Sequence, residues 1–265
     1  MKYLFTSIFL FLCWGNPPAL ADDDKNVFRL ATGEYQPYTS EFLPHYGIDN
    51  RIISEAFGEE GIRVEFNFFP WTRALNTAKA GDVDGTLPWA KRKGREDFFH
   101  YSDPVIEVDR EYFYYLKKSP FEWNPSVRNY EQLRGKTFAA IASANYGPKF
   151  QDAEANGTIS VNRVQEEQQT LRMLLAGRID IAIIKRRVAE FALNSFFSDQ
   201  QVERIERRPE SDDPPGYDYL LISKNAPNAR YHLESFNRGL KSLRTSGRYD
   251  QLMLKFENGT FAELK

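Results

Sequence analysis

The stretch from residue 81 to 104 reads Gly81-Asp82-Val83-Asp84-Gly85-Thr86-Leu87-Pro88-Trp89, then, after five residues, Arg95-Glu96-Asp97-Phe98-Phe99-His100-Tyr101-Ser102-Asp103-Pro104. A glycine ends a helical pattern, and the apolar residues after it predict a short strand over 83–87. A loop that carries a tryptophan follows, then an arginine, then an aromatic-Ser-Asp-Pro turn. Helix, glycine, strand and loop in this order are typical of one unit of an α/β domain.

The residues before this stretch extend the same scheme. Alternating apolar residues predict strands over 27–32 and 64–68, and helical spacing predicts helices over 48–57 and 71–80. Together with the strand over 83–87, the order is β-α-β-α-β. That order favours a mostly parallel sheet with helices on its faces.

A second unit of similar design follows from residue 133 onward. Its segment 174–180 repeats the helix-glycine-strand order of residues 76–84, which suggests two related lobes. The expected elements are strands over 112–118, 137–142, 161–164, 177–184 and 217–223, and helices over 166–176, 229–245 and 247–256.

Taken together, these motifs resemble the family 3 extracellular solute-binding proteins, from residue 29 to about 256. The ending Gly247-Arg248-Tyr249-Asp250 is similar to the close of that family. The resemblance implies an α/β, type II periplasmic-binding-protein fold. Two lobes, each a mostly parallel sheet flanked by helices, would be joined by a two-strand hinge. We expect lobe 1 at 22–109 and 217–265, and lobe 2 at 110–216.

The resemblance also implies where a ligand binds between the lobes. Arg95 matches the family's arginine, which grips a ligand carboxylate; a guanidinium fork binds that group bidentately. Without the family context, Arg95 could pair with Glu96 or Asp97, and Trp71 and Trp89 could be core residues. The candidate ligand-binding residues are Glu34, Tyr35, Trp71, Arg73, Thr86, Trp89, Arg95, Ser143, Asn145, Tyr146 and Lys185.

The sequence departs from the amino-acid binders of the family at Lys185. The resemblance places an aspartate there, which holds the ligand's α-ammonium. A lysine would repel an ammonium by on the order of 1 to 4 kcal/mol. One alternative is a cationic cleft of Arg73, Arg92, Arg95 and Lys185 that binds an anion such as a di-acid. The other is an amino acid whose ammonium pairs with Glu34.

The N-terminus reads as an export signal. A basic start and an apolar run precede an Ala-Leu-Ala site that ends at Ala21, so residues 1–21 form the expected signal peptide. The only cysteine, Cys13, lies inside it, so the mature chain would have no disulfide and no cysteine metal site. Removing Lys2 with the signal changes the formal charge from −2 to −3. This balance indicates neither nucleic acid nor an anionic membrane as partner.

These features lead to one functional expectation with two alternatives. We expect a monomeric periplasmic protein that carries a small polar ligand to the membrane subunits of an ABC importer, with no cofactor. The fold also serves in ligand sensing beside a membrane receptor, and in cyclohexadienyl dehydratase-like lyases, for which Glu34 is the only acid/base candidate. The three histidines lack metal-ligand spacing, and no nucleophile elbow is present, so we do not expect an enzyme.

Overall fold

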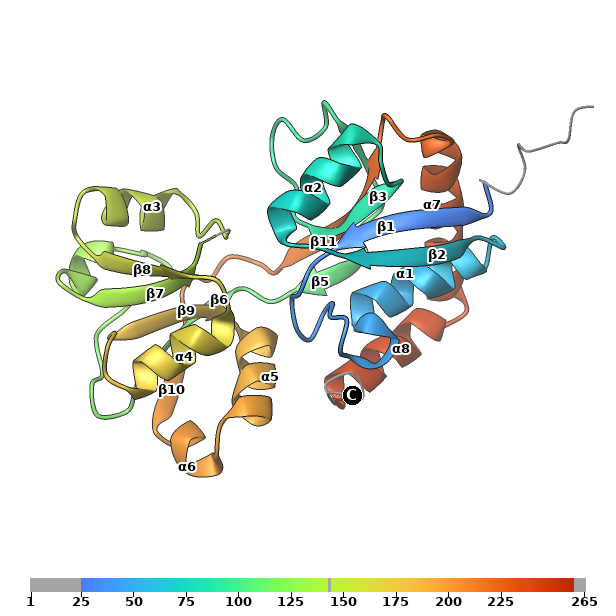
Figure 1. The fold of residues 1–265 in the computed structure, drawn as a ribbon. Coiled ribbons are helices and arrows are strands. Elements are labelled where there is room, and N and C mark those ends of the chain that lie inside the picture. Colours follow the sequence, from blue (N-terminus) through green and yellow to red (C-terminus); the bar gives the residue numbers. More distant parts are fainter. Residues whose placement is uncertain (1–24, 143, 260–265) are drawn as a thin grey trace, which may run out of the picture.

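The computed structural model describes residues 25–142 and 144–259, which form two α/β lobes side by side (Figure 1). Two segments of chain cross between them. The first is Asp109-Arg110, between strands β5 (Ile106–Val108) and β6 (Glu111–Leu116). The second is residues 210–215, between β10 (Ile205–Pro209) and β11 (Gly216–Ser223). The expected two-lobed α/β architecture with a two-strand hinge is confirmed.

The sheet of the first lobe combines both ends of the described chain. Its strands lie in the order β2-β1-β3-β11-β4, and β5 pairs with β11. The three N-terminal strands are parallel, whereas β11 runs antiparallel to β3, β4 and β5. Alternating apolar residues of β1 (Phe28, Leu30) are fully buried, as the sequence pattern predicts. The remaining bounds are β1 (Val27–Thr32), β2 (Arg63–Phe68), β3 (Gly85–Trp89) and β4 (Phe99–Tyr101).

Four helices cover this sheet, and two of them touch closely. They are α1 (Ile48–Gly58), α2 (Trp71–Ala80), α7 (Ala229–Thr245) and α8 (Arg248–Glu257). A Cβ atom at Gly239 would lie 1.9 Å from the carbonyl oxygen of Ala56, so only glycine permits this contact between α7 and α1. The C-terminal helices are therefore an integral part of the first lobe.

The second lobe is built from one continuous stretch of chain. Its sheet has the order β10-β6-β9-β7-β8, with β7, β8 and β9 parallel and β6 and β10 antiparallel to their neighbours. An aromatic core of Phe113, Trp123, Tyr130, Phe138 and Phe150 fills one side. The other elements are β7 (Thr137–Ile141), β8 (Ser160–Val164), β9 (Ile181–Lys185), α3 (Pro148–Ala155), α4 (Glu167–Leu175), α5 (Arg186–Phe196) and α6 (Asp199–Val202). Short 3-10 helices span Pro44–Tyr46 and Tyr130–Leu133.

The bounds of most predicted elements agree with the structure within two residues at each end, and two of the predicted strands begin later than expected. The strand predicted over 177–184 begins only at Ile181, because Gly177 adopts a left-handed conformation (φ 69°) that ends the preceding helix in a turn. The strand predicted over 83–87 lies at 85–89, so Trp89 belongs to it. In both lobes the parallel strands end toward the space between the lobes (Figure 1). Side chains that follow those strand ends are therefore placed at the interlobe face.

Candidate functional site

Two tryptophans form the centre of a connected group on the first lobe. The rings of Trp71 and Trp89 meet edge to face, with centroids 5.5 Å apart. Trp71 Nε1 donates to the carbonyl oxygen of Glu34 at 3.2 Å, and Trp89 Nε1 donates to Thr86 Oγ1 at 3.0 Å. A Cβ atom at Gly33 would lie 2.8 Å from Trp71 Cε2, so the glycine after β1 leaves the space for this ring. Both tryptophans are half-buried, which leaves part of each ring accessible.

Arg95 belongs to the same group. Its guanidinium lies over the Trp89 ring, 4.4 Å from the centroid, and Nη1 donates to the carbonyl oxygen of Ala90 at 3.0 Å. Burial of the charged group lowers the pKa of Arg95. Within the described parts of the chain no carboxylate forms an ion pair with this arginine, and neither Glu96 nor Asp97 does so. Arg95 is therefore a partly desolvated cation that lacks an anionic partner among residues 25–142 and 144–259.

Tyr35 lies where the two lobes approach each other. It follows β1, is half-buried, and stacks on Tyr38 with centroids 5.2 Å apart. Burial raises the pKa of Tyr35 well above its usual range, and the negative charges of Asp218, Glu167 and Glu111 add to this effect. Glu111 and Glu167 belong to the second lobe, so Tyr35 is within electrostatic range of carboxylates from both lobes.

The candidate residues in the loop after β7 use their polar atoms locally. Tyr146 is buried, and its hydroxyl accepts a hydrogen bond from the Ile141 amide at 2.9 Å. Asn145 is exposed; its Oδ1 accepts from the Gly147 amide at 2.9 Å and from Gln151 Nε2 at 3.0 Å. The candidate Ser143 lies outside the described residues. The hydroxyl of Tyr146 thus holds the loop against the end of β7.

Two further candidates on the first lobe point to different neighbours. Arg73 is exposed, and its guanidinium lies 4.7 Å from the ring centroid of Phe69. Glu34 is exposed, and its Oε1 accepts a hydrogen bond from the Glu41 amide at 2.9 Å. Neither side chain contacts the tryptophans directly in a hydrogen bond or ion pair of the described residues. Their place in the binding site stays a prediction.

Lys185, at the end of β9, is held by the neighbouring strand and by the first crossing segment. Its Nζ lies 3.2 Å from Glu111 Oε1 and donates to the carbonyl oxygen of Asp109 at 3.0 Å. The pairing follows from the sheet register, because Glu111 of β6 lies directly opposite Lys185. The charge of this lysine is therefore already balanced within the protein.

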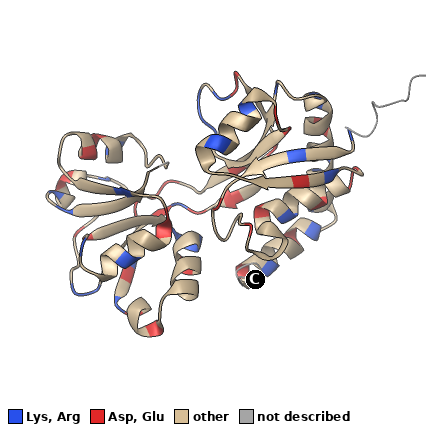
Figure 2. Ribbon diagram, in the orientation of Figure 1, with Lys and Arg blue, Asp and Glu red and all other residues tan. Residues whose placement is uncertain are grey.

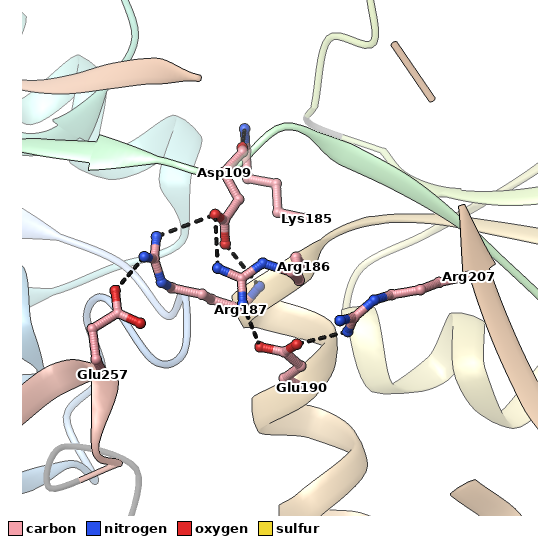
Figure 3. A network of polar contacts seen from close by, with 7 residues as sticks. All are labelled: Asp109, Lys185, Arg186, Arg187, Glu190, Arg207 and Glu257. Atoms are coloured by element: carbon pink, nitrogen blue, oxygen red, sulfur yellow. Dashed lines mark hydrogen bonds and ion pairs between the residues drawn. The ribbon is translucent and has the colours of Figure 1, made fainter. Parts of the chain in front are cut away.

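The two arginines that follow are balanced in the same way (Figure 3). Asp109 accepts from Arg186 Nη2 and Arg187 Nη1, each at 3.2 Å, and from the Arg187 amide at 3.1 Å, where α5 begins. A carboxylate at a helix N-terminus also suits the helix dipole. Arg187 reaches across to Glu257 of α8 in the first lobe, and Glu190 joins Arg186 to Arg207. This network leaves little unbalanced positive charge at the start of α5.

Sequence reasoning missed two carboxylates at the interlobe face. Glu167 is half-buried at the first position of α4, and burial raises its pKa to about 7. Asp218, on β11 after the second crossing segment, is only 7% exposed; burial raises its pKa, Lys185 opposes that rise, and the charge of Asp218 in turn raises the pKa of the fully buried Asp49. No hydrogen bond or ion pair joins either carboxylate to another residue that the structure describes. Acidic residues are common at helix starts because they suit the helix dipole, so the sequence alone does not single out Glu167.

No group of three or more histidine, cysteine, aspartate or glutamate side chains that could hold a metal ion occurs in the described residues. Within residues 25–142 and 144–259, no helix is both long and apolar enough to cross a membrane. The signal peptide expected at 1–21 lies outside the described part.

The two lobes are joined by two crossing segments and present aromatic and charged side chains at the face between them. This arrangement is that of a hinged ligand-binding protein. The chain matches the model of the bacterial extracellular solute-binding proteins, family 3, over residues 30–259. It belongs to that family, and the resemblance seen in the sequence is confirmed.

Individual relatives are distant. The chain is 19% identical over 248 residues to the "Probable amino-acid-binding protein YxeM" of Bacillus subtilis (strain 168), covering 92% of this chain and 89% of the relative. It is similar in structure to the substrate-binding protein of an amino acid ABC transporter (TM-score 0.66, 18% identity, 86% and 98% of the two chains). It is also similar to a histidine kinase sensor domain with similarity to periplasmic binding proteins (TM-score 0.69, 18% identity, 88% and 96%).

Proposed function

We propose that this protein traps a small, polar, carboxylate-bearing ligand in a cleft between its lobes and delivers it to an ABC importer. The observation that carries the proposal is Arg95, a half-buried guanidinium on the face of Trp89 with no carboxylate partner among the described residues. A ligand carboxylate would supply that partner in a bidentate geometry. The family's amino-acid-binding relatives support a ligand of this size and polarity.

Trapping follows from the two-lobed arrangement. A ligand held by Arg95 and the tryptophans of the first lobe would also meet the loops that end β7 and β9 of the second. Only contacts with both lobes favour the closed form, because a ligand shifts the equilibrium by its difference in affinity for the two states. Closure would bring both outer rims together, and the importer's membrane subunits would recognise that arrangement.

The cellular setting forms part of the same proposal. An export signal at residues 1–21, cleaved near Ala21, would place the mature chain in the periplasm. The mature chain would act there as a monomer. Ligand exchange in such a protein needs no cofactor and no covalent step. The proposed lobes are residues 22–109 with 217–265, and residues 110–216.

Calorimetric titration of the mature protein tests the proposal. Arg95→Ala should weaken binding of the best ligand by about 30- to 150-fold, as expected when a charge-assisted bidentate contact is lost. Arg178→Ala is the matched control, since Arg178 is an exposed arginine in the turn before β9, at the end of that strand away from the interlobe face. Equal affinity in the wild type and the Arg95→Ala variant would overturn the assignment of Arg95.

A second candidate function is ligand sensing. The similarity to a histidine kinase sensor domain supports it, because the same fold serves there as a receptor module. Radiolabelled ligand uptake by cells with and without the gene separates the two candidates. A carrier protein is required for uptake at submicromolar ligand, whereas a sensor changes gene expression while uptake persists.

A further inference from the structure

The second crossing segment is bound to the second lobe along its first four residues. The carboxylate of Glu210 accepts hydrogen bonds from Arg128 Nε at 2.8 Å and from the Tyr130 hydroxyl at 2.7 Å. The carbonyl oxygen of Glu210 accepts from Trp123 Nε1 at 3.0 Å, and Arg128 also forms an ion pair with Asp213 at 2.9 Å. All three partners lie between β6 and β7, so this part of the segment is carried by the second lobe.

The first crossing segment is attached to the same lobe. The carboxylate of Asp109 binds the guanidinium groups of Arg186 and Arg187, where α5 begins. Arg110 Nη1 donates to the carbonyl oxygen of Ser211 at 3.1 Å and so joins the two segments to each other. Acidic residues lie along both crossing segments (Figure 2), and their ion pairs are with cations of the second lobe.

These contacts leave the bending points at the ends of the two segments that meet the first lobe. On the first segment the point lies just after Val108, the last residue of β5. On the second it lies at Pro214, Pro215 and Gly216, which have no polar side chain to bind either lobe. The two points adjoin, because Gly216 pairs with Val108 in the sheet register. A few such residues are enough to absorb a hinge rotation, so we call this pair of points the joint.

An ion pair spans the joint. Arg187 is carried by the second lobe, where Asp109 binds its guanidinium and its amide, and the guanidinium also binds Glu257 of α8 (Figure 3). α8 in turn is fixed within the first lobe by the ion pair of Arg248 with Glu55 at 2.6 Å. The other ion pairs of α5 and α8 stay within one lobe or reach a crossing segment. Rotation at the joint therefore moves the two partners of this ion pair relative to each other.

We propose that the ion pair between Arg187 and Glu257 is a latch, which holds the two lobes in this arrangement and sets how often the ligand-free protein leaves it. The two side chains are 19% and 46% exposed, so water screens the pair only in part. The Arg187 guanidinium also lies 5.7 Å from the ring centroid of Phe256 on α8. Because apparent affinity depends on the fraction of protein in the binding-competent arrangement, the latch would tune affinity without touching the ligand.

Distance measurements between the lobes of the ligand-free mature protein test the latch. Spin labels at Lys241→Cys on α7 and Arg172→Cys on α4 use exposed positions of the two lobes, and residues 22–265 contain no other cysteine. Pulsed electron double resonance then gives the populations of the lobe arrangements. Glu257→Gln should lower the ratio of latched to unlatched protein about two- to fivefold, as expected for a partly exposed ion pair. Glu257→Lys should lower it further, because it places a second cation beside Arg187.

Glu60→Gln is the matched control, because it removes the ion pair with Arg238 inside the first lobe. Loss of the latched population in both Glu257 variants but not in Glu60→Gln supports the inference. The inference is overturned by equal distance distributions in the wild type and Glu257→Lys, by an equal change in Glu60→Gln, or by a wild type that lacks the distance of this structure. No ligand is present in this experiment, so its result is independent of the proposed function, which the Arg95→Ala titration tests.

Discussion

Lys185 Nζ lies 3.2 Å from Glu111 Oε1, across adjacent strands of the second lobe. The side chains of the two residues are 26% and 29% exposed, so water screens the pair only in part. A lysine at the end of β9 would indicate an anion-binding site if its charge were unpaired. Here the lysine is paired with Glu111, the residue opposite it on β6.

The pair can be tested by removing the lysine. Lys185→Met should leave Glu111 unpaired at the interlobe face and increase the affinity for a cationic ligand about three- to tenfold, because a positive charge is lost near the site. The free energy of unfolding should fall by about 1 kcal/mol. Calorimetry and chemical denaturation measure the two effects.

Lys136→Met serves as the control for this variant. Lys136 forms a similar pair with Asp180, 3.3 Å away, at the opposite end of the same sheet. Its loss should change stability by a similar amount without changing affinity. A decrease in affinity for cations in Lys185→Met would contradict the balanced-lysine interpretation.

Binding should depend on pH through Glu167. Burial raises its pKa from the ordinary 4.5 to about 7, so the ionised fraction rises from about one tenth at pH 6 to about nine tenths at pH 8. The affinity for a cationic ligand should rise up to about tenfold over that range. The charge of the neighbouring Glu166 raises the pKa of Glu167 further, and the charge of Glu167 in turn raises the pKa of the Tyr35 and Tyr146 hydroxyls.

The carboxyl group of Glu167 should also make the stability of the protein depend on pH, in the direction opposite to that of the affinity. Because the folded state holds this proton more tightly than the unfolded state, the free energy of unfolding should fall as pH rises from about 4.5 to 7. Glu167→Gln should flatten both profiles between pH 6 and 8. A pH profile of affinity that is the same in wild type and variant would show that another group titrates.

The aromatic group on the first lobe depends on Gly33. Gly33→Ala would place a Cβ atom 2.8 Å from Trp71 Cε2 and 3.0 Å from the Phe69 carbonyl oxygen, so the indole ring must move. We expect a loss of about 1–3 kcal/mol in the free energy of unfolding and a shift in tryptophan fluorescence. Gly58→Ala is the control, since no atom lies within 4 Å of its Cβ position. Unchanged fluorescence in Gly33→Ala would contradict the tight fit of Trp71.

Local patterns predicted the architecture well because each lobe is built from short, strongly periodic elements. The helix over 229–245 matches α7 at both ends, since its apolar face is continuous and Ala229 follows a clear break. Strands β4, β5 and β10, in contrast, were not predicted. β4 and β5 have three residues each, too few to establish a period, and β10 reads Ile-Glu-Arg-Arg-Pro with little apolar character.

The site was predicted less completely, because its chemistry depends on pairing across the sheet. Counting along the chain found Lys185 but could not show that Glu111, 74 positions earlier, lies opposite it. In the same way, Glu167 and Asp218 act together on the pKa of Tyr35 only after both lobes have folded and approached each other. Arg95 lies over the Trp89 ring in the structure, and the role in ligand binding predicted for it from the sequence stays a prediction.

The position of β11 sets the order in which the molecule can be completed. This strand lies between β3 and β4 and also pairs with β5, yet it is made after every strand of the second lobe. Synthesis starts at the N-terminus, so strands within residues 111–209 can pair with one another before β11 has been made. The sheet of the first lobe then still lacks the strand that lies between β3 and β4. Domains usually finish in chain order during synthesis. Here the lobe that starts first finishes last, so a chain cut short before Gly216 would expose the open edges of β3 and β4.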